Sequence, residues 1–403
     1  MTLKNQEELL SYENIGSKII MAYYLDKINN NEFEKIIKNG VNIEEDELTS
    51  EKLEKEIEYF VSLGIPREYA VDAAKENLKR NSNNNINQYI DYINLKLNNL
   101  NDEVLMKKAT EILEYDSILK ANIVTTLDEA SQISMLLNNN SKASEYIEVA
   151  KKFGFKNVQV SGEVPFVFLS YGYTRIDTQP DKKVCLRAFP QENDKKKNIY
   201  GTKLVTEGVL FEFDRKKIIQ WLISNNFVDE LMTPNDLDNE EELKIWFLNN
   251  INTDSISTFS NIDRNIPTNE ITSYVYTLIH SVSHALIKEA SQLCGLDKNS
   301  ISEYIFPSIP AIFIYCHNSQ GFNLGALFNL FEAYFDKWLS AALEDIRKCI
   351  FDPVCIDRDK ACAGCILLNE VSCCHFNKDL DRSYLIGAFD KINRKKTIGY
   401  WNK

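Results

Sequence analysis

The stretch from Cys349 to Cys374 reads CIFDPVCIDRDKACAGCILLNEVSCC and contains six of the nine cysteines of this 403-residue chain. Cys362 and Cys365 form a CxxC pair, a spacing that lets two thiolates bind one ion from a tight turn. A tetrahedral ion needs four soft ligands at about 2.3 Å, and closely spaced cysteines supply them. The stretch therefore predicts a metal-binding segment, 349–375, that organises the C-terminal part of the chain.

Five cysteines of this segment are candidate metal ligands, and we expect four of them to bind: Cys349, Cys355, Cys362, Cys365 and Cys373. One possible set omits Cys349, and another omits Cys373. A set made only of thiolates favours a closed, structural Zn²⁺ site. An iron–sulfur cluster uses the same type of ligand and stays open as the alternative metal.

The composition is that of a globular protein, with 44% hydrophobic and 26% charged residues. No apolar run is long enough to span a bilayer, and the first residues lack the apolar core of a signal peptide. We therefore expect a cytoplasmic protein with reduced thiols and no membrane contact. The net charge of −13 argues against a stand-alone binder of duplex DNA, because such proteins usually present a basic surface.

The chain reads as an α+β protein in two parts. Residues 1–150 show helical spacing throughout, and within them 62–93 resembles a small three-helix module of the ubiquitin-associated type. Residues 155–395 read as a mixed α/β domain. Its expected strands are 158–169, 184–189, 204–213 and a short one within 306–315. Its expected helices are 215–225, 270–293 and 324–348, the last with an apolar face typical of a core.

Two further groups of residues have ambiguous roles. His280 and His284 share one face of the helix 270–293, and an HxxxH pair can bind metal. The zincin pattern needs a glutamate after the first histidine, where this chain has Ser281. The apolar surroundings favour buried histidines bonded to the backbone or to a carboxylate. The region around Tyr173, Arg175 and Trp221 could supply stacking and phosphate contacts to nucleic acid, but core positions are favoured for Tyr173 and Trp221. The basic residues near Tyr400 and Trp401 could form a second patch, for which solvated surface charge is the favoured interpretation.

Several of these pieces occur together, and in the same order, in one known family. The motifs are Gly172 to Arg175, Thr206 to Asp214, a helix carrying Trp221, His280 to Ile287, Ile314-Tyr315, Gly321 to Leu327, Asp352 to Cys355, Ala361 to Cys365, Ser372-Cys373 and Leu380 to Arg382. This series resembles the DUF1998 family, which is the zinc-binding domain at the end of MrfA-type repair helicases. Within that family it resembles the DrmB type of DISARM antiphage defence. The resemblance covers roughly residues 155–390.

The resemblance implies a non-catalytic accessory subunit that carries zinc and works with a superfamily 2 helicase, contacting DNA through the joint complex. The five candidate cysteines would carry the metal. The chain contains no GxxxxGK[ST] loop and no GxSxG motif, which is consistent with helicase activity residing in a partner.

Two alternative functions remain. One is a metal-dependent nuclease or hydrolase that uses His280, His284, His317 and nearby carboxylates. The other is a protein–protein adaptor that acts through 62–93 without contacting DNA.

Overall fold

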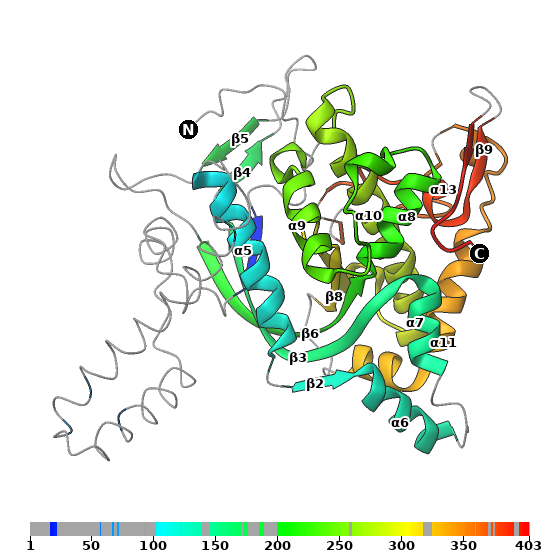
Figure 1. Ribbon diagram of the computed structural model, residues 1–403. Helices are drawn as coiled ribbons and strands as arrows, with labels where there is room; N and C mark the ends of the chain where they lie inside the picture. The colour runs from blue at the N-terminus through cyan, green and yellow to red at the C-terminus, as the bar shows by residue number, and fades with distance from the viewer. Residues whose placement is uncertain are drawn as a thin grey trace. The chain divides into compact units, whose positions relative to one another are not determined.

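The protein is described from a computed structural model, shown in Figure 1. The structure describes residues 17–21, single positions at 57, 67, 71 and 93, and 102–402 except 122, 139–144, 171, 176–184, 189–199, 258–259, 317–324, 359, 370–371, 374 and 391–394. It divides into two compact units. Unit 1 contains Met1–Ser117 and Pro165–Val205, and unit 2 contains Ile118–Val164 and Thr206–Lys403. The predicted module at 62–93 lies outside the described residues, apart from three single positions.

The mixed α/β class is confirmed, but the N-terminal third is less purely helical than its sequence indicates. Strand β1 (Ser17–Met21) pairs with residues 166–170 of β3, and β2 (Ile123–Thr126) pairs with residues 159–162 of β3, both antiparallel. Both strands are short apolar or β-branched runs, which sequence periodicity does not separate from helix. Helix α5 (Asp102–Leu119) agrees with the prediction. In unit 1, β4 (Gly172–Arg175) and β5 (Cys185–Ala188) form an antiparallel pair.

The main sheet has the order β1-β3-β6-β8-β7, with β2 pairing β3 beside this path. Its long strands are β3 (Phe155–Ser170) and β6 (Tyr200–Phe213), followed by the hairpin of β7 (Ile301–Phe306) and β8 (Ala311–Cys316). β8 is antiparallel to both of its neighbours. Strands β3, β6 and β8 were predicted, whereas β7 was not. Side chains alternate between the two faces of β8, so Ile312 and Ile314 face the main core while Phe313 and Tyr315 stack on each other at 5.8 Å.

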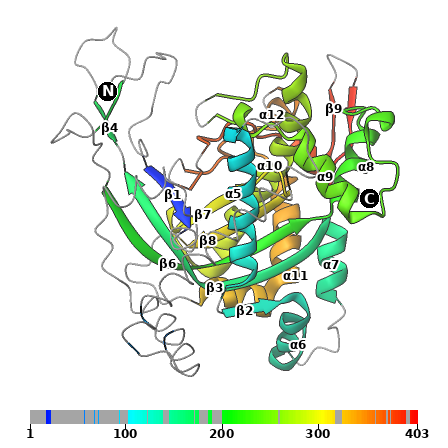
Figure 2. The ribbon, with the colours of Figure 1, turned by 60° about the vertical axis from the view of Figure 1, so that its left-hand side comes forward.

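Helices of unit 2 form most of the rest of the fold (Figure 2). Their bounds are α6 Leu127–Asn138, α7 Glu145–Phe153, α8 Arg215–Ser224, α9 Glu240–Asn250, α10 Pro267–Cys294, α11 Ala326–Ile346, α12 Val354–Asp357 and α13 Ser383–Ile386; three 3₁₀ turns lie at Glu230–Met232, Thr253–Ser255 and Lys298–Ser300, and a last hairpin joins β9 Ala388–Asp390 to β10 Lys395–Thr397. None of the described helices is long and apolar enough to cross a membrane.

Helix α10 is the centre of unit 2. It begins with Pro267 in its first turn and ends at Gly295, whose φ of 65° closes the helix in the left-handed conformation. Between these ends its middle turns are buried on all sides, as expected of a helix surrounded by other elements. It packs along α11, where the indole N–H of Trp338 donates to Leu286 O at 2.9 Å. The predicted apolar face of α11 is confirmed at Phe331 and Phe335, which are fully buried.

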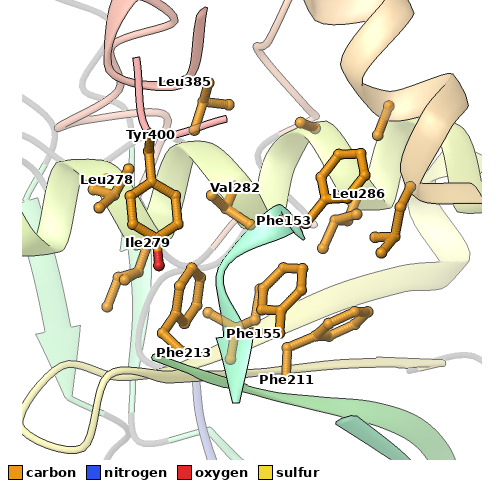
Figure 3. Close-up of a cluster of buried hydrophobic side chains, with 14 of the residues drawn as sticks. Phe153, Phe155, Phe211, Phe213, Leu278, Ile279, Val282, Leu286, Leu385 and Tyr400 are labelled. Atoms are coloured by element: carbon orange, nitrogen blue, oxygen red, sulfur yellow. The ribbon is translucent and has the colours of Figure 1, made fainter. Parts of the chain in front are cut away.

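An aromatic core joins the sheet to α10 and to the C-terminal tail. Figure 3 shows Phe155, Phe211 and Phe213 from β3 and β6 facing α10, with Tyr400 beside them. The ring of Phe155 lies 5.0 Å from that of Phe211 and 5.1 Å from that of Phe213. At these separations aromatic pairs stabilise the fold beyond the contribution from burying their apolar area.

Trp221, considered above for nucleic-acid stacking, belongs to this core, and so do the two aromatic residues of the candidate basic patch near the C-terminus, which is therefore not a solvated surface at these two positions. Trp221, Tyr400 and Trp401 are all buried. The Tyr400 hydroxyl donates to Gly154 O at 2.8 Å, and the Trp401 indole donates to Phe153 O at 3.1 Å. Gly154 has a φ of 85°, and a Cβ there would collide with the Tyr400 ring. The tail is therefore a built-in part of unit 2.

We predict that Tyr400→Ala lowers the free energy of unfolding by about 3–5 kcal/mol, because it empties a buried aromatic site. Chemical denaturation measures the change. Phe389→Ala is the matched control, since Phe389 is 56% exposed, and its change should stay within about 0.5 kcal/mol. Equal denaturation midpoints for the two variants would contradict the structural role of the tail.

Candidate metal centre

Four cysteines follow the end of α11 and lie on one irregular loop. Cys349 comes three residues after the helix ends, and Cys355 lies in the short helix α12. Cys362 and Cys365 flank a tight turn in which the Cys365 N–H donates to Cys362 O at 3.0 Å. The turn aims both sulfurs of the CxxC pair at one side of the loop, as the spacing predicts.

The four sulfurs converge on a common point. Cys349 Sγ lies 3.4 Å from Cys362 Sγ, Cys355 Sγ lies 3.8 Å from Cys365 Sγ, and the two CxxC sulfurs are 3.5 Å apart. A tetrahedron with Zn–S bonds of about 2.3 Å has edges of about 3.8 Å between sulfurs. None of these four cysteines forms a disulfide. The four-cysteine cluster therefore fits a structural zinc ion in both ligand type and size.

A bound metal ion would change the protonation of these thiols. Burial raises the pKa of the Cys365 thiol to about 11, so without a cation it stays protonated at neutral pH. A bound divalent ion removes the protons, because a coordinating thiol is deprotonated outright. The backbone N–H of Cys362 donates to Cys365 Sγ at 3.3 Å, which also stabilises a thiolate.

A buried cation lies beside the four-cysteine cluster. The Arg382 guanidinium is fully buried and pairs with Asp352 and with Ile346 O. Burial alone lowers the pKa of Arg382, but the Asp352 hydrogen bond and the sulfurs of Cys365 and Cys355 raise it above its ordinary value. A centre with four thiolates around one divalent ion is negative, so this arginine compensates its charge.

The fifth candidate, Cys373, lies outside the four-cysteine cluster. Its Sγ is 3.3 Å from His280 Nε2 and belongs to a second group with His284 and Glu303, whose ligand atoms all lie within 4.8 Å of one another. We call this group the histidine cluster. His280 and His284 come from α10 and Glu303 from β7. His317, the third histidine considered for catalysis, lies outside the described residues.

The histidines are buried and contact a carboxylate, as their apolar surroundings indicate. His280 Nε2 lies 3.0 Å and His284 Nε2 lies 3.2 Å from Glu303 Oε1. Burial lowers the pKa of His284. Burial alone raises the pKa of Glu303, but the two imidazoles overcome this effect and lower it well below its ordinary value. Glu303 was missed from sequence; the signal was a lone carboxylate in the apolar strand ISEYIF.

Comparisons with known proteins agree with this geometry. Residues 282–366 match the family model of the MrfA Zn-binding domain, and all four clustered cysteines lie inside this range. The chain is also similar to the DISARM protein DrmB of Bacillus paralicheniformis, with 23% identity over 253 residues, which are 59% of this chain and 42% of the relative. The chain thus spans under half the length of that relative. The resemblance predicted from sequence is confirmed.

We predict that Cys362→Ser removes one zinc ion per chain and unfolds the loop, because binding of structural zinc contributes on the order of 10 kcal/mol. Elemental analysis and thermal melting measure the two effects. Cys316→Ser is the control, since Cys316 lies outside both clusters and its loss should leave the metal content unchanged. A Cys362→Ser variant with full metal content and normal melting would exclude Cys362 as a ligand.

We further predict that Arg382→Met lowers zinc affinity by about 10–100-fold, the usual effect of losing a partner behind the metal ligands. Competition with a chromophoric chelator measures the affinity. Arg347→Met is the matched control because Arg347 is exposed at the end of α11. Equal affinities for the two variants would show that Arg382 does not support the centre.

Proposed function

We propose that this chain, which carries a zinc-binding domain of the MrfA type, is a non-catalytic accessory subunit of a DNA-acting antiphage complex. In this proposal 155–395 form the accessory domain, and Cys349, Cys355, Cys362 and Cys365 hold the zinc ion. A superfamily 2 helicase is the partner and supplies the catalytic activity. The observation that carries the proposal is the four-cysteine cluster within the range that matches the MrfA domain.

A closed metal centre supports a binding role over a reaction centre. Catalytic zinc has three protein ligands and keeps one position for water or substrate, whereas four thiolates fill the coordination shell. The histidines of the alternative hydrolase are also inaccessible, since His280 and His284 have 0% of their surface exposed. Substrate would have to displace the core of unit 2 to reach them.

The metal-binding loop also offers a surface for a partner. Three apolar side chains between Cys349 and Cys355 are exposed: Ile350 by 84%, Phe351 by 53% and Val354 by 58%. Contiguous apolar exposure of this kind is typical of interaction sites. We propose that the helicase partner contacts these residues, because the zinc ion would hold them rigidly in place.

DNA contact is proposed to occur through the complex. The net charge of −13 disfavours strong binding of phosphate by the chain alone. A joint complex can still hold DNA if the basic surface is provided mainly by the helicase.

The test is co-purification of the full chain with a candidate superfamily 2 helicase, followed by measurement of DNA binding. We expect a stable complex that binds DNA more tightly than the helicase alone, with affinity falling as salt rises. The double variant Ile350→Ser with Val354→Ser should weaken the complex at least tenfold while keeping its zinc. Leu231→Ser is the matched control, since Leu231 is 93% exposed elsewhere.

Two results would overturn this proposal. One is that the zinc-loaded chain does not associate with the helicase. The other is an intact complex in which the chain leaves both DNA binding and helicase activity unchanged.

A further inference from the structure

The histidine cluster consists of four metal-ligating side chains that are withdrawn from solvent. His280, His284 and Cys373 are 0% exposed and Glu303 is 2% exposed. Two turns of α10, strand β7 and the metal-binding loop each contribute to it. A carboxylate buried to this extent costs several kcal/mol unless opposite charge compensates it. The Glu303 carboxylate therefore needs a positive charge close to it.

The spacing of the ligand atoms matches a tetrahedral ion. Two imidazole nitrogens lie 3.0 and 3.2 Å from Glu303 Oε1, and Cys373 Sγ lies 3.3 Å from His280 Nε2. A tetrahedral zinc ion gives edges of about 3.3 Å between nitrogen and oxygen ligands and about 3.6 Å between nitrogen and sulfur. The three observed separations lie slightly below these edges, and two of the three sulfur separations in the four-cysteine cluster are likewise below their edge.

The hydrogen bonding of His284 places a lone pair against the carboxylate. His284 Nδ1 lies 2.9 Å from Ile366 O, and a carbonyl oxygen only accepts, so Nδ1 carries the hydrogen. In the neutral imidazole Nε2 is then an acceptor, and it faces Glu303 Oε1, another acceptor. Two facing acceptors at 3.2 Å repel each other unless a metal ion or an additional proton lies between them. The contact between His280 Nε2 and the same oxygen cannot relieve this conflict.

The surroundings of the cluster are those of metal ligands. An Nδ1–H bonded to a backbone carbonyl is the usual way to orient a histidine that binds metal through Nε2. The backbone N–H of Asn377 lies 3.4 Å from Cys373 Sγ and donates to it. Among the described residues, Glu303 Oε2 and His280 Nδ1 are buried without a hydrogen-bond partner, so the second carboxylate oxygen remains available to the ion.

We propose that His280, His284, Glu303 and Cys373 form a second site for a divalent transition metal, zinc by preference. Two imidazoles, a carboxylate and a thiolate are all ligands that zinc accepts. The site has four protein ligands and almost no exposure to solvent, so it is structural and fastens α10 and β7 to the loop that follows Cys365. This inference is independent of the proposed partner and of DNA binding.

The experiment is elemental analysis of the full chain, expressed with added zinc and purified by gel filtration. We expect two zinc ions per chain. Glu303→Gln and Cys373→Ser should each retain one ion, and Cys362→Ser should retain the other. Cys294→Ser is the matched control with two ions, because Cys294 lies outside both clusters. One ion per wild-type chain, or two ions in both Glu303→Gln and Cys373→Ser, would overturn the proposal.

A measurement on the wild type keeps the test valid if those variants fail to fold. X-ray absorption at the zinc edge should report five sulfur and three nitrogen or oxygen ligands per two ions, from the membership of the two clusters. If all zinc ligands were sulfur, the second site would be refuted. The histidine cluster would then be a network of hydrogen bonds that share protons.

Discussion

Four cysteine sulfurs converge in a loop that has almost no regular structure of its own. Between Ile346 and Ser383 the described residues include a single helix, the four-residue α12. Most of its backbone hydrogen bonds close local turns, and a tetrahedral ion provides a crosslink between these turns. The backbone N–H of Arg382 then donates to Lys360 O at 2.9 Å, which ties the residues after the loop to a segment between two of the clustered cysteines.

The two clusters are joined through the backbone next to Cys365. The Ile366 carbonyl receives the His284 N–H, and Lys288, one turn further along α10, donates to Cys365 O at 3.0 Å. The central helix and the cysteine loop are thus held together by polar bonds as well as by packing. These bonds hold the cysteine loop in a fixed position on α10, which is consistent with a unit that presents a surface to a partner.

Local patterns predicted the elements whose side chains repeat with a clear period. The long strands β3 and β6 and the helices α10 and α11 are examples. Strand β7 was missed because Glu303 interrupts its apolar run. The partners of Glu303 are His280 and His284 of α10, which are too distant in sequence for a local pattern to reveal them. Spacing alone likewise left Cys349 and Cys373 as equal choices. Only the tertiary structure turns Cys373 toward the histidines, so this part of the site was beyond local reasoning.

The bond between Tyr400 and Gly154 spans 246 residues and sets an order of events during synthesis. At about 5–20 residues per second, a ribosome needs on the order of 10 to 50 s to travel from one to the other. For that time Phe153 lacks the ring of Trp401, which lies 5.3 Å from it in the folded protein. A nascent chain therefore exposes this apolar surface until residues 400–401 have been synthesised, and a chaperone would be most useful during this interval.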